Sequence, residues 1–296
     1  MPTAKGLEQT VDFRVTLRYT IVNTLKLIEE NIMTHFNTII IGAGLAGLTA
    51  AIYSARKGNS TLLLESTVLG GQIIYVDKVD NYPALPNTSG VDIISAAAEQ
   101  AQSLGAEIKY EAAIKIDADK TVTTSSNEYT ADKIIIAIGI TRKKLEVMGE
   151  EPLTGRGISY CAVCDGAFYK SKTAIVIGKG KMANEDIEFL TPICKNVIHL
   201  PDPKAIEEIK GDQAVTSVLL TDGTEIPTDA VFVAVGMSVN TAWLPQEIKR
   251  TEKGFIITDE SCQTSLDGIY AAGDCRDKKH RQLITAAADG CIAALS

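Results

Sequence analysis

Two cysteines separated by two residues stand near the middle of the chain, in the stretch Ser159-Tyr-Cys-Ala-Val-Cys-Asp-Gly166. Such a pair can be a reversible dithiol, half of a zinc site, or two thiols in a turn. Zinc usually takes four ligands, commonly from two such pairs or from one pair with histidines. This chain has a single CxxC motif and only three histidines. A reversible dithiol is favoured, because Cys161 and Cys164 can form a small ring at a helix start, where backbone N–H groups lower a thiol pKa.

Asp165 directly follows the second cysteine. A carboxyl group in this place can pass the proton that each thiol–disulfide exchange step requires. Cys161, Cys164 and Asp165 are therefore the candidate catalytic residues, and no metal ligand is predicted. The remaining cysteines have no partner at such spacing and are interpreted as packing residues. They are Cys194, Cys262, Cys275 and Cys291.

A glycine-rich motif, Gly42-Ala43-Gly44-Leu-Ala-Gly47, follows the apolar run Thr38–Ile41 and opens an alanine-rich helix predicted over Leu48–Lys57. In this context the glycines allow a tight turn and a close approach of a pyrophosphate to the backbone, while the helix N-terminus presents free N–H groups. Glu65 ends the next predicted strand, Thr61–Leu64, where its carboxylate can accept hydrogen bonds from ribose hydroxyls. The sequence therefore predicts a dinucleotide site here.

A second motif of this kind, Gly178-Lys-Gly-Lys-Met-Ala183, follows the predicted strand Thr173–Ile177. NADPH sites usually place arginine just past the next strand, here Asn196–Leu200, to grip the ribose 2′-phosphate. No arginine occurs between Arg156 and Arg250, and the strand is followed by Pro201 and Asp202 instead. This site either takes NADH or another nucleotide, or is a relic that binds no pyridine nucleotide, and the second interpretation is favoured.

Two strand–glycine-loop–helix units predict two α/β domains. The apolar runs at 134–139 and 231–236 each end in a glycine and would close one unit each. The expected fold class is α/β, with two Rossmann-like, three-layer nucleotide-binding domains.

Composition narrows the functional classes. The chain has 296 residues, 45% of them hydrophobic, and a net charge of −8, so nucleic acid is not an expected partner. No apolar stretch approaches the roughly 18–20 residues that would span a bilayer. Few cysteines in a long chain indicate a reducing, cytoplasmic compartment and no disulfide framework. Residues 1–33 are predicted to form a separate extension, part of it with helical spacing, and Met33 could be a second start site.

From about His35 to the C-terminus, the chain resembles the low-molecular-weight thioredoxin reductases. The most specific element is the hexad CAVCDG lying between two dinucleotide motifs. Further matches are Gly-Gly-Gln at 70–72, Val-Asp-Asn-Tyr-Pro at 79–83, Ala-Ala-Gly-Asp at 271–274 and Arg-Gln at 281–282. The resemblance implies a discontinuous FAD-binding domain, made of 34–142 and 240–296, into which a second domain, 143–239, is inserted.

The resemblance also implies roles for single residues. Cys164 would lie against the flavin and receive its electrons, Cys161 would attack the disulfide of thioredoxin or a similar protein, and Asp165 would donate the proton. Asp274 would contact the ribityl-phosphate region of FAD, with the 281–282 pair near the isoalloxazine ring. The cofactor-binding residues expected in full are Gly42, Ala43, Gly44, Gly47, Glu65, Gly71, Gln72, Asn81, Gly139, Gly273, Asp274, Arg281 and Gln282. A homodimer is expected.

The chain departs from the resemblance around the second motif. The segment His199-Leu-Pro-Asp lacks the basic residues of NADPH-using members, and 201–214 is shorter than this lobe normally needs. We therefore expect electrons from ferredoxin, or a second nucleotide such as another flavin, rather than NADPH. A docked ferredoxin would need a basic patch. Two candidates are Lys170, Lys172, Lys179 and Lys181, and Arg276, Lys278, Lys279, His280 and Arg281.

Three other functions remain open from the sequence. One is a dithiol oxidase of the same fold, which passes electrons from a small dithiol to oxygen. Another is an NAD(P)H-dependent thioredoxin reductase, and the third is a redox sensor without turnover. In the leading hypothesis the inserted domain rotates on hinges at Thr141–Lys144 and Ser238–Thr241, so that the dithiol alternates between flavin and partner.

Overall fold

The computed structural model describes residues 33–296. The predicted extension therefore lies, apart from Met33, outside the described residues. Within them, no helix is long and apolar enough to cross a membrane.

The larger sheet has seven strands in the order β3-β2-β1-β6-β5-β4, with β16 paired to the second half of β6. Strands β1, β2, β3, β6 and β16 run parallel, and β4 and β5 form an antiparallel extension at one edge. Parallel strands buried on both faces explain the unbroken apolar runs in the sequence. The bounds are β1 Thr34–Ile41, β2 Thr61–Leu64, β3 Glu107–Lys109, β4 Ala113–Ile116, β5 Thr121–Thr124, β6 Glu128–Ile136 and β16 Ile269–Ala271.

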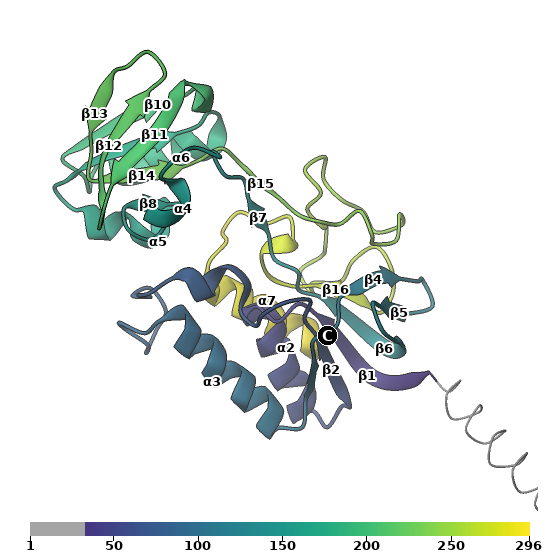
Figure 1. Cartoon of the computed structure of the whole chain (residues 1–296). Helices are drawn as coiled ribbons and strands as arrows, with labels where there is room; N and C mark the ends of the chain where they lie inside the picture. The colour runs from purple at the N-terminus through teal and green to yellow at the C-terminus, as the bar shows by residue number, and fades with distance from the viewer. Residues whose placement is uncertain (1–32) are drawn as a thin grey trace, which may run out of the picture.

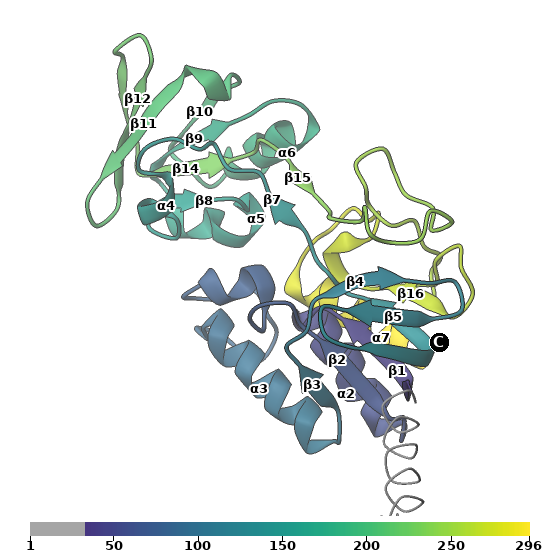
Figure 2. The ribbon, with the colours of Figure 1, turned by 45° about the vertical axis from the view of Figure 1, so that its right-hand side comes forward.

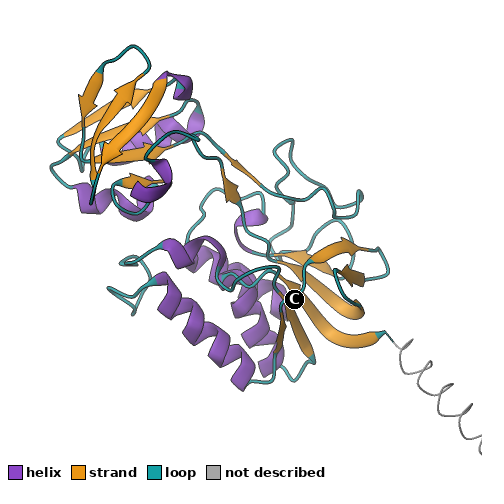
Figure 3. Cartoon of the chain, viewed as in Figure 1, coloured by secondary structure: helices purple, strands orange, loops and turns teal. Residues whose placement is uncertain are grey.

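Helices α2 (Leu45–Arg56), α3 (Gly90–Ser103) and α7 (Leu283–Leu295) cover one face of this sheet (Figures 1 and 3). Alternate strand residues such as Ile40 and Ile135 pack in the cluster that these helices share. Their chain neighbours point to the opposite face and pack against the segment from Val239 to Ile256. The two apolar clusters fix the sheet between two layers, so the loops after its strands gather at one edge.

A second, smaller unit contains a parallel sheet in the order β10-β9-β14-β8 and an antiparallel sheet β11-β12-β13 (Figure 2). Helix α6 packs on one face of the parallel sheet, and β11 and β12 cover the other. The bounds are β8 Ile158–Ser159, β9 Thr173–Ile177, α6 Lys181–Leu190, β10 Asn196–Leu200, β11 Ile206–Gly211, β12 Val215–Leu220, β13 Glu225–Pro227 and β14 Ala230–Val233. Short elements complete the list: η1 Gly71–Tyr75, α4 Glu150–Leu153, α5 Ala162–Asp165, η2 Gly166–Tyr169, η3 Pro203–Ala205 and η4 Gly273–Cys275.

Two chain segments join the units, β7 (Thr141–Arg142) and β15 (Met237–Ser238). They pair with each other in an antiparallel ribbon, with Arg142 opposite Met237 and Thr141 opposite Ser238. Figures 1 and 2 both show this ribbon as the narrow connection between the larger and the smaller unit.

The predicted α/β fold with two Rossmann-like units is confirmed, whereas several element bounds differ from the predictions. Helix α2 begins at Leu45, three positions before the predicted start, because Gly44 already has the extended backbone of a helix N-cap. Strand β6 begins at Glu128, before the apolar run at 134–139, because its polar first half pairs with β5.

Candidate redox and cofactor site

The two cysteines of the CxxC motif form a disulfide at the start of α5, with Cα atoms 5.3 Å apart. Cys161 is the N-cap of this single helical turn, and its Sγ accepts a hydrogen bond from the Cys164 backbone N–H at 3.2 Å. The Cys161 carbonyl accepts the N–H groups of Cys164 and Asp165. The predicted dithiol therefore has the helix-start environment that favours a thiolate in the reduced state.

Asp165 lies largely buried beside the disulfide. Its Oδ2 accepts a hydrogen bond of 2.5 Å from the hydroxyl of Ser159. Burial raises the pKa of Asp165, while the Ser159 hydrogen bond and the charge of Arg142 lower it. The carboxyl group of the residue that follows Cys164 is thus anchored in surroundings that raise its pKa, as suits a group that exchanges protons. Ser159 was not among the predicted site residues.

Arg142, in the connecting strand β7, brings a positive charge to the junction of the two units. Burial lowers the pKa of its guanidinium, and the charges of Asp274, Asp186 and Asp165 act in the opposite direction. Burial also raises the pKa of Asp186 to about 6. Asp274 belongs to the larger unit and the other two carboxylates to the smaller one, so the charge of Arg142 interacts with acids from both units.

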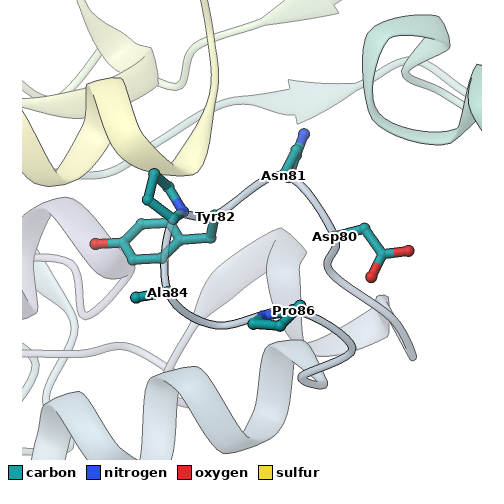
Figure 4. Close-up of a pocket in the computed structure, with 6 residues that line it drawn as sticks. Asp80, Asn81, Tyr82, Ala84 and Pro86 are labelled. Carbon is teal, nitrogen blue, oxygen red and sulfur yellow. The ribbon is translucent and has the colours of Figure 1, made fainter.

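The disulfide faces the larger unit through Gln282, the N-cap of α7. The Gln282 Nε2 lies 3.9 Å from Cys164 Sγ, and the Gln282 Oε1 accepts a hydrogen bond of 3.1 Å from Asn81 Nδ2. Three predicted site residues that are far apart in the sequence therefore meet. The loop that carries Asn81 lines an open pocket of about 490 Å³ with Asp80, Tyr82 and Pro86, among others (Figure 4).

A second contact between the units lies nearby. The ammonium group of Lys78 stands 5.5 Å from the ring centroid of Phe168, in the turn after the dithiol. Phe168 and Val163 remain 42% and 51% exposed. Apolar side chains thus flank the dithiol on a surface that water still reaches.

The first glycine motif forms a tight turn between β1 and α2. A Cβ on Gly47 would lie 1.9 Å from the Gly42 carbonyl oxygen, so only glycine lets the helix approach the turn this closely. At Gly44 a Cβ would meet only the Gly70 carbonyl oxygen, at 3.9 Å. The second glycine is therefore not required by the protein's own packing, and the space above it is open for a ligand.

Glu65 lies beneath the same turn. Its Oε2 accepts the Ala43 N–H at 2.9 Å, and its Oε1 accepts the Thr67 N–H at 3.0 Å. The Ala43 carbonyl in turn accepts the Gly70 N–H at 2.8 Å. Two of the predicted cofactor residues, Ala43 and Glu65, are thus joined by hydrogen bonds in one backbone cradle, and Gly71 and Gln72 follow it directly in the chain, in η1.

Gly139 and Gly273 follow strands β6 and β16 at the same edge of the sheet. Gly139 has a φ of +61°, and no atom lies within 4 Å of a Cβ placed there. Asp274 Oδ1 is buried and has no hydrogen-bond partner among the described residues, and burial raises the pKa of this carboxyl. The ammonium group of Lys278 lies 3.9 Å from this oxygen, too far for a hydrogen bond. A buried oxygen without a hydrogen bond, next to an open glycine turn, fits a cofactor that supplies hydroxyl donors, as the ribityl chain of FAD does.

The proposed basic patch at 276–281 was wrong as a docking surface, because most of its charges are used inside the protein. Asp289 of α7 binds Arg276 Nη1 at 2.6 Å and Lys278 Nζ at 2.8 Å, and accepts the Gly273 N–H at 3.0 Å. The Arg281 guanidinium donates to three backbone carbonyls and stacks 4.2 Å from the Phe255 ring. These bonds fix the loop that carries Asp274 instead.

The second glycine motif makes a hydrogen bond with a residue of the neighbouring strand β10. The His199 Nε2 lies 2.8 Å from the Gly178 carbonyl oxygen, so an imidazole from β10 contacts the start of the loop. Asp202 caps η3 by accepting the Lys204 N–H at 3.1 Å. The chain then passes directly into β11. Lys170, Lys172, Lys179 and Lys181, the other predicted basic patch, are all exposed in this unit.

Cys262 and Cys275 are fully buried, and burial raises the pKa of their thiols to about 11 and about 12. Both therefore remain protonated thiols at neutral pH. Cys194 is partly buried, and burial raises the pKa of its thiol as well.

The family model described as pyridine nucleotide-disulphide oxidoreductase matches residues 36–202 and 198–290. This chain belongs to that family. A thioredoxin reductase from Listeria innocua is 41% identical over 300 residues, which cover 90% of this chain and 92% of the relative.

Solved structures of thioredoxin reductases also match this chain in fold. The crystal structure of a thioredoxin reductase from Streptococcus pyogenes is 34% identical, with a TM-score of 0.84, and the match covers 89% of this chain and 97% of that one. A ferredoxin-flavin thioredoxin reductase from Clostridium acetobutylicum is 29% identical, with a TM-score of 0.53 over 89% of this chain and 96% of that one. This member of the pyridine nucleotide-disulphide oxidoreductases is thus an FAD-dependent oxidoreductase.

In this oxidoreductase, Asp289 is expected to support both stability and cofactor binding. Replacing Asp289 by Asn leaves two buried cations without their anion, so the free energy of unfolding should fall by about 3 kcal/mol. The affinity of the apoprotein for FAD should fall as well, because the 273–281 loop loses its anchor. Thermal unfolding and a fluorescence titration with FAD measure the two effects.

The matched control is Asp117→Asn. Asp117 pairs with Lys115 at 2.8 Å, but both side chains are well exposed. Such surface pairs contribute roughly 0–1 kcal/mol, so this change should leave both measurements almost unaltered. Equal effects of the two substitutions would contradict the anchoring role of Asp289.

Proposed function

We propose that this chain is a thioredoxin-disulfide reductase: it passes electrons through FAD and the Cys161–Cys164 pair to the disulfide of thioredoxin or a similar protein. The proposal is carried by the position of the disulfide. Cys164 Sγ lies 3.9 Å from Gln282 Nε2, next to the cradle that would hold the cofactor. Relatives named thioredoxin reductase, 41% identical over almost the whole chain, support the same conclusion.

The geometry of the cradle supports the following cofactor contacts. The turn at Ala43 and Gly44 would hold the pyrophosphate on the free N–H groups of α2, and Glu65 lies beneath it, within reach of the ribose. Asp274 Oδ1 would accept a hydroxyl of the ribityl chain. When bound, FAD supplies the two electrons that reduce the Cys161–Cys164 disulfide to a dithiol.

The reduced pair then transfers these electrons by two exchange steps. The Cys161 thiolate attacks one sulfur of the partner disulfide, which forms a Cys161–partner bond and breaks the partner's S–S bond. The departing partner thiolate takes a proton from Asp165. Asp165, now a carboxylate, takes the proton of Cys164. The resulting Cys164 thiolate attacks Cys161 Sγ, which restores the internal disulfide and releases the second partner sulfur as a thiolate that takes a proton from water. Two electrons have moved from the dithiol to the partner.

We further propose that 34–142 and 240–296 form the FAD-binding domain and that 143–239 moves as an inserted domain. The Cys164 sulfur now faces Gln282 across the junction, on the side of the cofactor cradle rather than toward a partner. Turning at Thr141–Lys144 and Ser238–Thr241 would carry Cys161, together with the exposed Val163 and Phe168, out to the partner.

For the electron donor we propose a ferredoxin-type protein. The chain has no arginine from 157 to 249 to grip a 2′-phosphate, Asp202 occupies the turn after β10, and His199 contacts the glycine loop. The likeness to a solved ferredoxin-flavin thioredoxin reductase supports this donor. NADPH is the second candidate, favoured by the higher identity to relatives named simply thioredoxin reductase.

An anaerobic titration distinguishes the two donors. We expect NADPH and NADH, added in stoichiometric amounts to the FAD-loaded protein, to leave the flavin absorbance unchanged over minutes, whereas reduced ferredoxin bleaches it. Rapid bleaching by either nucleotide would rule out the ferredoxin donor and leave the reductase function intact. Rapid oxygen consumption with a small dithiol, and none linked to thioredoxin, would identify a dithiol oxidase instead.

A further inference from the structure

Ser159 is the last residue of β8, and its hydroxyl stands between the two ends of the dithiol turn. The Ser159 Oγ accepts the Cys161 N–H at 3.0 Å and donates to Asp165 Oδ2 at 2.5 Å. The side chain is only 5% exposed, so water cannot readily replace either bond. One hydroxyl therefore ties the first cysteine to the acid that follows the second.

The other contacts of Asp165 leave its orientation to this hydroxyl. Its backbone N–H is fixed on the Cys161 carbonyl at 3.1 Å, which places the Cα but not the carboxyl group. Within residues 33–296, Ser159 is the hydrogen-bond partner that holds the carboxyl, and Oδ1 accepts no hydrogen bond there. One oxygen is thus anchored and the other is free to give or take a proton.

We propose that Ser159 is a positioning residue of the dithiol reaction, which holds Asp165 Oδ2 so that Oδ1 exchanges protons with the sulfurs. This inference rests on the proposed role of Asp165 as proton donor. It adds a residue outside the CxxC-Asp motif, from the neighbouring strand, that determines both where the acid lies and when it releases its proton.

The charged surroundings of Asp165 predict the direction of the effect. The positive charge of Arg142, on β7, lowers the pKa of Asp165. Tyr169, on η2, interacts with Asp165. Asp186, on α6, interacts with the same Arg142 guanidinium as Asp165 does. The Ser159 hydroxyl stabilises the carboxylate form. Without it, the buried carboxylate is less favourable, so Asp165 should keep its proton to a higher pH.

The test uses the full-length protein, reduced chemically, freed of reductant under anaerobic conditions and mixed with oxidised thioredoxin. The rate of dithiol oxidation is followed across the pH range. For Ser159→Ala we expect roughly a tenfold lower rate at neutral pH, since a positioned general acid contributes about a hundredfold or more. The alkaline limb of the pH profile should move to higher pH, because a general acid acts in its protonated form and this limb reports the ionisation of Asp165.

Two further variants test the hydroxyl itself. Ser159→Thr keeps a hydroxyl and should restore the position of the alkaline limb. Ser159→Gly removes the hydroxyl in a different way and should shift the limb as alanine does, so the result does not depend on one variant folding. Thermal unfolding of each variant reports any general loss of structure separately.

Ser217 offers a matched control in the same unit. It is also 5% exposed and donates a short hydrogen bond, of 2.6 Å, to a carboxylate, Glu225, but it lies in β12, away from the dithiol. Ser217→Ala should leave the pH profile in place. An unchanged profile in Ser159→Ala, or the same shift in Ser217→Ala, overturns the positioning role.

The same rates are measured with a small aromatic disulfide in place of thioredoxin. This arm separates the inference from the proposed function. If the parent protein oxidises rapidly with the small disulfide but not with thioredoxin, the proposed partner fails, while a shifted limb in Ser159→Ala still supports the role of Ser159. If the parent reacts with both and Ser159→Ala behaves identically, only the inference fails.

Discussion

Replacing Cys164 by serine is expected to abolish thioredoxin reduction and to leave Cys161 able to form a mixed disulfide that nothing resolves. The N-cap position of Cys161 gives its sulfur the backbone N–H of Cys164, which stabilises a thiolate in the reduced protein. The Cys164 sulfur instead faces Gln282 and the cofactor cradle. The first sulfur is thus suited to attack a partner and the second to receive electrons.

The measurement uses a thioredoxin with one cysteine, activated as a mixed disulfide with thionitrobenzoate. Cys164→Ser should release one equivalent of the coloured thiol per chain and form a covalent complex on a non-reducing gel. Cys161→Ser should do so far more slowly, because its remaining sulfur lies on the inner side. Turnover should fall to background in both variants.

Cys194→Ser is the control, because this partly buried cysteine lies in the same unit but outside the site. It should retain the activity of the parent. If Cys161→Ser forms the complex and Cys164→Ser does not, the two roles are exchanged. Full turnover in either variant would show that electrons do not pass through the pair.

Replacing Gly44 by alanine is expected to block FAD binding without destabilising the apoprotein, whereas the same change at Gly47 should destabilise the fold. A Cβ at Gly44 has no protein atom closer than 3.9 Å, so the obstacle it creates is to the pyrophosphate alone. At Gly47 the Cβ would collide with the Gly42 carbonyl at 1.9 Å and push α2 from the turn.

Each variant serves as the control for the other. For Gly44→Ala we expect a loss of FAD affinity of about a hundredfold or more, equivalent to about 2.7 kcal/mol, with the apoprotein melting temperature unchanged. For Gly47→Ala the free energy of unfolding of the apoprotein should fall by about 2–4 kcal/mol. Normal FAD binding by Gly44→Ala would mean that the cofactor backbone lies elsewhere.

Local patterns sufficed to predict the fold class and the elements around each motif. The apolar runs before Gly42 and Gly178 became the buried strands β1 and β9, because parallel strands covered on both faces leave a continuous apolar signature. The resemblance brought together Asn81, Cys164 and Gln282, residues that no spacing rule connects, and in the structure they meet.

Pairings between distant segments were not visible in the sequence. Arg276 and Lys278 were predicted to form part of a surface patch, because charged residues in a polar loop are usually solvated. In the structure, Asp289 of α7 forms ion pairs with both. A signal did exist: Asp289 is the only charged residue of the otherwise apolar or small helix Leu283–Leu295. A lone acid on such a helix indicates a buried counter-charge.

Ser159 was missed for a different reason. Serine two residues before a cysteine carries no distinctive spacing, and only the two-residue strand β8, paired with β14, places its hydroxyl against Asp165. Its role therefore depends on tertiary structure rather than on the motif.

The ribbon of β7 and β15 limits how the two units can move. Because β7 and β15 are hydrogen-bonded to each other, they form a single connection rather than two independent linkers. Twisting this ribbon preserves its inter-strand hydrogen bonds, whereas pulling the units apart or sliding one past the other would break them. The motion of the dithiol-bearing unit that costs the least free energy is consequently a rotation about this ribbon, with Arg142 on the rotation axis.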